Sequence, residues 1–110
     1  MRWHREFEWD EAKAQLNLRK HRVSFDDAGR VLGDEEADTY HVEEFDEEHS
    51  DEEDRYVTTA SHPDDRQIVL RIAWTERAET QAKNPITRIL SARLATTRER
   101  KTYAKEIGRK

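Results

Sequence analysis

The chain has 110 residues, a formal net charge of -5 at pH 7, 34% hydrophobic and 41% charged residues, and no cysteine. This length allows one domain with a single modest core, here residues 1–110, and the periodic apolar residues argue against general disorder. The sequence has no bilayer-spanning apolar run, no apolar signal-peptide region and no thiol for disulfides or metal sites, so we expect a cytoplasmic protein without a membrane segment.

The first third of the chain predicts a short extended stretch at residues 5–9, followed by a helix. Asp10 is a suitable N-cap for a helix over residues 11–21. Within it, Ala12 and Leu16 are four residues apart and share one apolar face.

A second helix follows at once. Ser24, with an acid three residues later, predicts its N-cap, and Gly33 predicts its end. The next segment, residues 34–54, is rich in Asp and Glu, and we name it the acidic segment. It contains only a weak indication of an edge strand at residues 38–42 and is otherwise predicted to be loop.

From residue 55 onwards the apolar period changes to two. Strands are predicted at residues 55–61, 66–77 and 86–94, with a turn between the first two and residues 78–85 as the next connection. This pattern is typical of an antiparallel hairpin followed by a third strand, with one apolar face.

The last element predicted is a helix over residues 97–107. Thr96 and Glu99 have the spacing of a capping box at its start. The order of elements is therefore β-α-α-(β)-β-β-β-α. We interpret it as an α+β fold with a small antiparallel sheet, two N-terminal helices and a C-terminal helix, with the helices packed on one face.

The charges are separated into blocks along the chain. Residues 31–54 contain thirteen Asp and Glu and no Lys or Arg, whereas residues 66–110 contain twelve Lys and Arg against four acids. Exposed charges more than about 10 Å apart are largely screened at ordinary salt, so the basic half can bind a polyanion although the whole chain is acidic. We interpret the acidic segment as a solvated face rather than as a polyanion mimic lying over the basic half.

Arginines are concentrated in the last strand and helix. Arg88 and Arg93 are five residues apart, so strand alternation places them on opposite faces unless the strand contains a bulge. The planar guanidinium group suits phosphate oxygens, which makes the cluster a candidate nucleic-acid site. Judged by spacing alone, a solvated charge-rich face, or a docking surface for the acidic segment, is the more economical interpretation.

Cleavage of RNA is one reaction that such a surface can support without a metal ion. The 2′-hydroxyl attacks the adjacent phosphate when a base takes its proton and cations stabilise the developing charge. His21 is our first candidate for proton transfer, because imidazole exchanges protons near neutral pH. The alternative is that it complements the dipole at the end of its helix. Tyr103 is able to donate a proton or stack on a base, although its spacing with Ile107 is also that of a half-buried core residue.

Other chemistries have little support in the sequence. His41 and His49 lie among acids, but their spacing matches no strong metal-ligand pattern. The three glycines form no phosphate-binding loop. We therefore expect no metal and no cofactor.

Three separated motifs in the same order resemble the BrnT family of bacterial and archaeal toxins, whose members look like small RelE-type ribonucleases. The motifs cover most of residues 7–103 and read FEWDEAKAQLNLRKHRVSF, EEHSDEEDRY, and WTER followed by RILSARLATTRERKTY. The resemblance implies a RelE-like fold and a toxin that degrades RNA and so inhibits translation. It also implies neutralisation by a BrnA-like antitoxin with a ribbon-helix-helix DNA-binding part, and repression of the shared promoter only by the toxin–antitoxin complex.

The resemblance also implies a candidate active surface. Its candidate catalytic residues are Lys20, His21, Arg55, Arg77, Arg93 and Tyr103. The candidate RNA-binding residues are Lys13, Arg88, Arg98, Arg100 and Lys101. We assign the arginines to the phosphate and either His21 or Tyr103 to proton transfer.

Two departures from the family pattern keep an alternative open. Arg22 stands where the family usually has glycine, so a left-handed helix stop there costs about 1 kcal/mol or is replaced by another turn. The acidic segment and residues 78–85 are also longer than the usual loops. A catalytically inactive antitoxin-binding module or transcriptional co-repressor with the same fold therefore remains an alternative function. For the assembly, both a homodimer and a heterotetramer with the antitoxin remain open.

Overall fold

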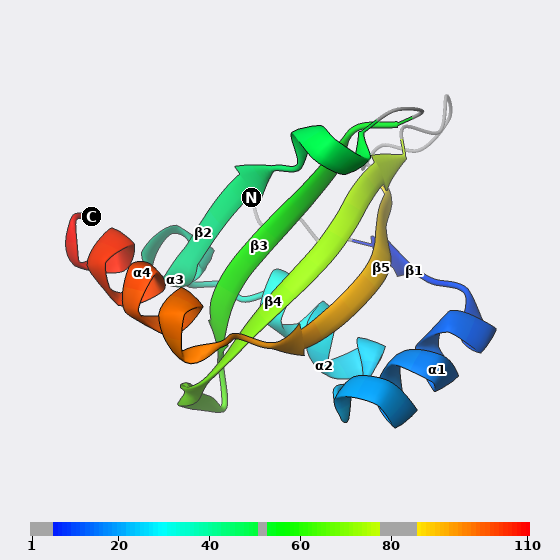
Figure 1. Ribbon diagram of the computed structural model, residues 1–110, viewed down its shortest axis with the longest axis horizontal. Coiled ribbons are helices and arrows are strands. Elements are labelled where there is room, and N and C mark those ends of the chain that lie inside the picture. The colour runs from blue at the N-terminus through cyan, green and yellow to red at the C-terminus, as the bar shows by residue number, and fades with distance from the viewer. Residues whose placement is uncertain (1–5, 51–52, 78–85) are drawn as a thin grey trace.

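The computed structural model describes residues 6–50, 53–77 and 86–110. The elements are β1 (Glu6–Glu8), α1 (Glu11–His21), α2 (Phe25–Leu32), α3 (Ala37–Tyr40), β2 (His41–Phe45), the 3₁₀ turn η1 (Glu47–His49), β3 (Arg55–His62), β4 (Asp65–Arg77), β5 (Ile86–Leu94) and α4 (Thr97–Gly108) (Figure 1). The α+β class and the order of the predicted elements are confirmed. The predicted connection at residues 78–85 lies outside the described residues.

The acidic segment contains more regular structure than its composition predicts. Helix α3, strand β2 and the turn η1 all lie within it, and the weakly predicted edge strand begins at His41 rather than at residue 38. The prediction of a mostly irregular loop is therefore wrong. Pairing with β3 stabilises β2, and sequence composition carries no information about that contact.

The strands form one sheet in the order β1-β5-β4-β3-β2. Strands β2 to β5 pair antiparallel, but β1 pairs parallel with β5, so the sheet is mixed and not purely antiparallel as predicted. Parallel pairing needs a long connection between the two strands. Here that connection is most of the chain, which is why local patterns could not indicate it.

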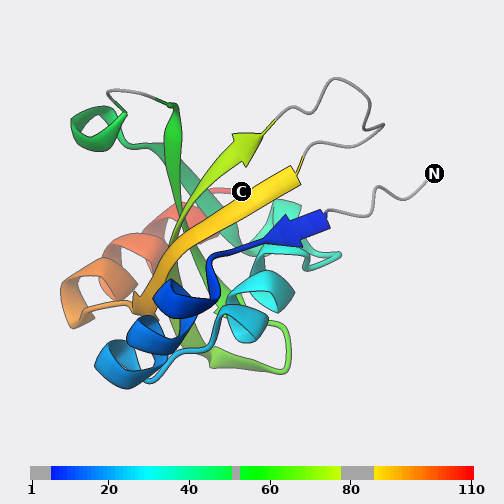
Figure 2. The same cartoon turned by 90° about the vertical axis from the view of Figure 1, so that its right-hand side faces the viewer.

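The helices lie on both faces of the sheet, which corrects the prediction that they all pack on one face. Helix α2 covers one face, α1 flanks the β5 edge, and α4 lies against the other face at the end near β2 (Figure 2). The contact of α4 is made by Tyr103, which is 6% exposed and hydrogen-bonds to Ser61. The spacing of Tyr103 and Ile107 indicates an apolar side of the helix but does not say which face of the sheet that side meets.

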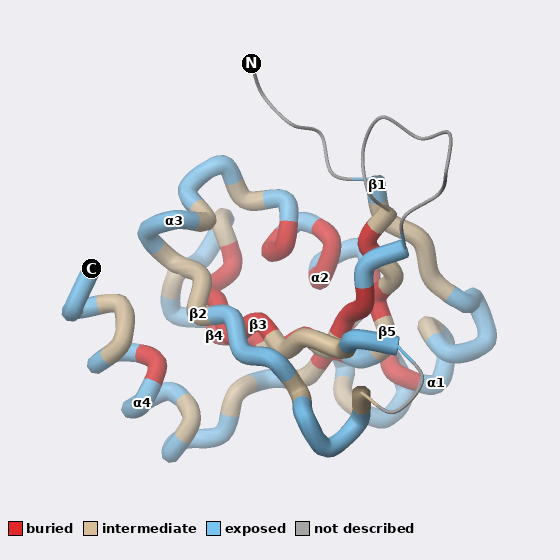
Figure 3. The backbone as a smooth tube through the Cα atoms, turned by 90° about the horizontal axis from the view of Figure 1, so that it is seen from above, coloured by how far each residue is buried: buried red, intermediate tan, exposed pale blue. Residues whose placement is uncertain are grey.

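The core lies between the sheet and α2, where the buried positions concentrate (Figure 3). Its members are Val23, Phe25, Ala28, Val31, Leu32, Ala60, Leu70, Ile72, Trp74, Ile89 and Ala92. Trp74 stacks on Tyr56 with ring centroids 4.8 Å apart, and its indole N–H donates a 2.9 Å hydrogen bond to Thr58. This small core matches the low apolar content of the chain. No helix in the described part of the chain is long and apolar enough to cross a membrane.

Helix α1 is held by a buried polar residue and not by the predicted apolar face. Leu16 is exposed, whereas Asn17 is buried. The Asn17 amide nitrogen donates to the carbonyls of Ala92 and Val23 at 2.8 and 3.0 Å, and its oxygen accepts from the Ala92 N–H at 3.1 Å. Strand β1 pairs only with Ile86–Arg88 of β5, so further along that edge the Asn17 side chain takes the place of a neighbouring strand.

Helix α1 ends at Arg22 in the left-handed conformation, although the family usually has glycine at this position. Arg22 has φ 60° and ψ 24°, and its N–H donates a 2.9 Å hydrogen bond to the Leu18 carbonyl. The helix stop is therefore kept at the expense of backbone strain in a residue with a Cβ atom.

Replacing Asn17 with Ala is expected to destabilise the fold by about 2–3 kcal/mol, because the N–H and carbonyl of Ala92 lose their partner in a buried site. Urea unfolding at neutral pH measures this. Gln15→Ala, at an exposed position of the same helix, is the matched control and should cost less than about 0.5 kcal/mol. Equal effects of the two substitutions would contradict a special role of Asn17.

The substitution Arg22→Gly should raise the free energy of unfolding by about 0.5–1 kcal/mol, since glycine relieves the left-handed strain but loses more chain entropy on folding. Arg19→Gly, three residues earlier in the helix, should lower it by about 1 kcal/mol. Denaturant unfolding should therefore show changes of opposite sign in the free energy of unfolding of the two variants. A loss of stability in both variants would refute the strain argument.

Candidate functional site

The sheet face opposite α2 is only partly covered, and we name it the open face. The turn η1 and helix α4 both rise from this side, while α2 lies on the other (Figure 2). Cross-strand pairing places Arg71 beside Thr59 and Arg93, and the neighbouring row contains Ala73 and Ser91.

A bulge in β5 brings the arginines of that strand onto the open face. Ala73 pairs with Ser91 and Trp74 pairs with Ile89, so Leu90 has no partner of its own in β4. The extra residue reverses the alternation, and Arg88 faces the same side as Arg93. The sequence allowed Arg88 and Arg93 to share a face only if the strand contains a bulge, and the structure contains that bulge.

The open face contains a groove of about 480 Å³, which is within the usual range for ligand sites. We name it the open-face groove. Its lining residues are Glu44, Phe45, Asp46, Glu47, Glu48, His49, Val57, Arg71, Ala73, Ser91 and Arg93. One wall comes from the acidic segment, and Arg71 and Arg93 come from the central strands. Interpreting the acidic segment only as a solvated face is therefore incomplete.

Glu99, the third residue of α4, holds both groove arginines. Arg93 donates to its two carboxylate oxygens at 2.7 and 2.9 Å, and the Nε atom of Arg71 lies 3.2 Å from Oε2. The same carboxylate accepts the Thr96 N–H at 2.9 Å and so completes the predicted capping box. The hydrogen bonds from Arg93 lower the pKa of Glu99 from 4.5 to about 2, against the opposing effect of burial.

Arg71 reaches across the groove. Its guanidinium donates to Thr59 at 3.1 Å and lies 3.5 Å from the Glu44 carboxylate. It therefore touches the strand floor, the helix cap and the acidic wall. The sequence indicated no special role for Arg71, although the alternation that places Arg77 on the polar face of β4 places Arg71 there as well.

Three further predicted arginines share the open face beyond the groove. Arg77 lies 2.9 Å and Arg88 3.6 Å from the Glu8 carboxylate on β1. Arg55 lies opposite Thr75, and its Nε atom is buried without a hydrogen-bond partner among the residues that the structure describes. The predicted Arg55, Arg77, Arg88 and Arg93 are thus brought onto one face.

The candidates on α1 lie elsewhere. Lys13, Lys20 and His21 belong to a helix that Asn17 attaches to the β5 edge of the sheet. Lys13 and Lys20 are exposed there, and His21 is half-buried. None of these three residues is among those that line the open-face groove.

Tyr103 and the basic residues of α4 lie outside the lining of the open-face groove. The Tyr103 hydroxyl donates to the Tyr40 carbonyl at 2.7 Å and accepts the Ser61 N–H at 3.2 Å, so it is already engaged within the fold. Arg98 lines a smaller pocket of about 200 Å³ together with Arg71. Arg100 and Lys101 are exposed on the same helix.

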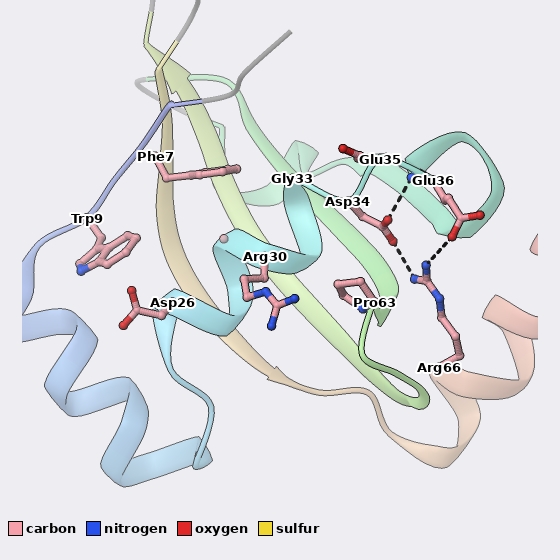
Figure 4. Close-up of a pocket in the computed structure, with 11 residues that line it drawn as sticks. Phe7, Trp9, Asp26, Arg30, Gly33, Asp34, Glu35, Glu36, Pro63 and Arg66 are labelled. Atoms are coloured by element: carbon pink, nitrogen blue, oxygen red, sulfur yellow. Dashed lines mark hydrogen bonds and ion pairs between the residues drawn. The ribbon is translucent and has the colours of Figure 1, made fainter. Parts of the chain in front are cut away.

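A larger groove of about 880 Å³ lies on the side of α2. It is lined by Phe7, Trp9, Asp26, Gly29, Arg30, Gly33, Asp34, Glu35, Glu36, Pro63 and Arg66 (Figure 4). Its arginines are paired, Arg66 with Asp34 and Glu36 at 2.6 and 3.1 Å, and Arg30 with Asp64. Four carboxylates against two arginines disfavour an anionic ligand. The smaller open-face groove is therefore the better phosphate site.

Glu99→Gln is expected to destabilise the fold at pH 7 by about 2–3 kcal/mol, since a folded pKa about 2.5 units below the unfolded value corresponds to stability of that order. This contribution is complete above pH 5 and is lost as the pH falls from 5 towards 2. The difference between wild type and variant in urea unfolding should shrink over that range. Glu106→Gln, on the same helix but with its side chain 43% exposed, is the control and should show a small difference at every pH.

Comparison with known proteins points to one family. No curated protein matches the chain. The structure is similar to the crystal structure of the Brucella abortus ribonuclease toxin BrnT, with a TM-score of 0.53, 18% sequence identity and coverage of 86% of this chain and 100% of that chain. The family model described as "Ribonuclease toxin, BrnT, of type II toxin-antitoxin system" matches residues 9–99, which confirms the resemblance seen in the motifs. The protein therefore belongs to the BrnT family of ribonuclease toxins of type II toxin–antitoxin systems.

Proposed function

We propose that this toxin is an endoribonuclease that cleaves RNA in the open-face groove without a metal ion and thereby inhibits translation in the cytoplasm. The observation that carries the proposal is the pair Arg71 and Arg93, which Glu99 holds side by side at the edge of that groove. Cations fixed before the substrate arrives stabilise the charge of a transition state without reorganising.

The chemistry fits the groove. When a 2′-hydroxyl attacks the adjacent phosphorus, negative charge accumulates on the phosphate oxygens, and guanidinium groups bind these oxygens through paired hydrogen bonds. Arg93 has both Nη atoms on Glu99, whereas Arg71 places Nε and one Nη on carboxylates and donates through its other Nη to the neutral Thr59 hydroxyl. We assign Arg71 to direct phosphate contact and Arg93 to the shared positive potential.

The remaining open-face arginines are suited to bind the RNA on either side of the reacting phosphate. Arg77 and Arg88 continue the basic surface towards β1, and Arg55 flanks Thr75 on the side opposite Arg88. Arg98, Arg100 and Lys101 continue it along α4. Phosphate contacts of this kind position a strand and make its binding dependent on salt.

Tyr103 supports the groove indirectly in this proposal, because its hydroxyl already joins α4 to α3 and β3. The end of α1, with Lys20 and His21, is the rival location for the chemistry. It contributes no residue to the lining of the open-face groove, which makes it the weaker assignment.

RNA cleavage in EDTA tests the proposal directly. The wild-type protein should cut RNA to products ending in a 2′,3′-cyclic phosphate, and Arg71→Gln should lower the single-turnover rate about 100-fold or more. Arg30→Gln, on the opposite side of the sheet, is the matched arginine control and should retain the wild-type rate. If His21→Gln lowered the cleavage rate about 100-fold and Arg71→Gln did not lower it, the active site would lie on α1 instead.

The proposed partner is a BrnA-like antitoxin with a ribbon-helix-helix part, because the matched family belongs to type II toxin–antitoxin systems. Expression of the toxin should arrest growth, and co-expression of the antitoxin should restore it. The pair, but not the toxin alone, should shift its own promoter DNA in a gel. Intact RNA together with normal growth would instead support an inactive antitoxin-binding module. The Arg22 departure no longer favours that alternative, since the left-handed helix stop is retained.

A further inference from the structure

We propose that His49 is the general base of the open-face groove, taking the proton from the attacking 2′-hydroxyl, and that Asp46 positions it. The inference rests on the proposed ribonuclease function and assigns a proton-transfer residue within it. Both residues belong to the acidic segment, on the wall of the groove.

The contact between the two side chains fixes the orientation of the imidazole. His49 Nδ1 lies 3.0 and 3.2 Å from the two carboxylate oxygens of Asp46. A carboxylate accepts a hydrogen bond, so the neutral ring carries its proton on Nδ1 and leaves the lone pair of Nε2 available. No side chain in the described parts of the chain is recorded against Nε2, and the His49 side chain is 61% exposed.

Asp46 is itself anchored. Its N–H donates a 2.8 Å hydrogen bond to the Arg55 carbonyl, which ties the start of η1 to β3. The Asp46 side chain is only 20% exposed. The carboxylate is therefore held in place beneath a histidine whose free nitrogen remains accessible, an arrangement that suits a base and its orienting group.

The arginines and His49 line the same groove from different walls. Arg71 and Arg93 come from β4 and β5, and His49 comes from η1. A phosphate bound by the arginines would therefore lie in a groove that His49 also lines. General-base catalysis requires the base to come within hydrogen-bond reach of the hydroxyl it deprotonates, so the proposal places the 2′-hydroxyl of the bound RNA beside His49.

Other histidines that the structure describes are committed elsewhere. His62 is buried, with Nε2 at 3.1 Å from Asp27 and Nδ1 accepting the Asp64 N–H. His41 Nε2 lies 2.8 Å from the Val31 carbonyl. His21 lies on α1 at the β5 edge and is not among the residues that line the groove.

The proposed cleavage is a transesterification in which the 2′-oxygen displaces the 5′-oxygen from phosphorus. Nε2 of His49 takes the proton from the 2′-hydroxyl, whose oxygen forms a bond to phosphorus while the bond from phosphorus to the 5′-oxygen breaks. The 5′-oxygen leaves with that electron pair and takes a proton from water, and the resulting hydroxide removes the proton from the imidazolium. The products are a 2′,3′-cyclic phosphate and a 5′-hydroxyl, and the enzyme is unchanged.

The first test is the single-turnover rate of His49→Ala on RNA. We expect a loss of about 10²- to 10⁴-fold, the usual contribution of a general base. Binding of a 2′-deoxy RNA analogue, measured by fluorescence anisotropy, should change little. Added imidazole should restore part of the rate to His49→Ala and should not accelerate the wild type. A wild-type rate in His49→Ala, or no rescue by imidazole, would overturn the inference.

A modified substrate separates a base from an acid. When sulfur replaces the 5′-oxygen of the cleaved bond, the leaving group needs no proton. His49→Ala should remain slow on this substrate, because the 2′-hydroxyl still has to be deprotonated. Recovery of the wild-type rate would show that His49 is an acid and would contradict the proposal.

The role of Asp46 is tested by non-additivity. Asp46→Asn should slow cleavage about 10-fold or more by weakening the orientation of the imidazole. The double variant Asp46→Asn/His49→Ala should be no slower than His49→Ala, and a further loss would indicate a purely structural role. Glu43→Gln, an exposed acid on the other face of β2, is the control for charge. If the wild-type protein leaves RNA intact, the proposed ribonuclease function itself fails. If the wild type cleaves RNA and His49→Ala cleaves it at the same rate, only the assignment of His49 fails.

Discussion

The carboxylate of Glu99 is the contact on which the geometry of the open face depends. It caps α4 through Thr96, binds Arg93 through both oxygens and also holds Arg71. One side chain therefore starts the last helix, attaches it to the sheet and orients two cations. Removing it would leave two arginines without their partner in a partly desolvated site, which costs more than the loss of one surface pair. The same interaction that stabilises the C-terminal part of the fold thus builds the groove.

The separation of charge along the chain also has a structural result. The acidic segment does not stay apart from the basic half, because pairing of β2 with β3 carries Glu44 and η1 to the edge of the open face. The groove then contains both signs of charge. A polyanion meets attraction from the strands and repulsion from the wall, so general affinity is lowered while a phosphate placed between the arginines is still favoured. The acids also provide Asp46, which orients His49.

Features decided within a few residues could be predicted from the sequence. Asp10, Ser24 and Thr96 cap their helices as expected, because each cap is a hydrogen bond to a backbone N–H three residues away. The three long strands follow from their alternation. The apolar spacing of Leu16 does not indicate that it is exposed, since the face a helix buries depends on what packs against it. Here that partner is the backbone of Ala92, which selects the polar Asn17.

By itself the sequence determined the order of the elements, most of their ends, the supply of arginines and, through three motifs in order, the family. Only the tertiary structure decided which side chains meet. The bulge at Leu90 places Arg88 and Arg93 on one face, and the position of α4 brings Glu99 to Arg71. These outcomes depend on contacts between residues far apart in the chain, where a shift of one residue in strand pairing moves every side chain to the other face. For that reason the sequence pointed first to His21, and the structure points to His49.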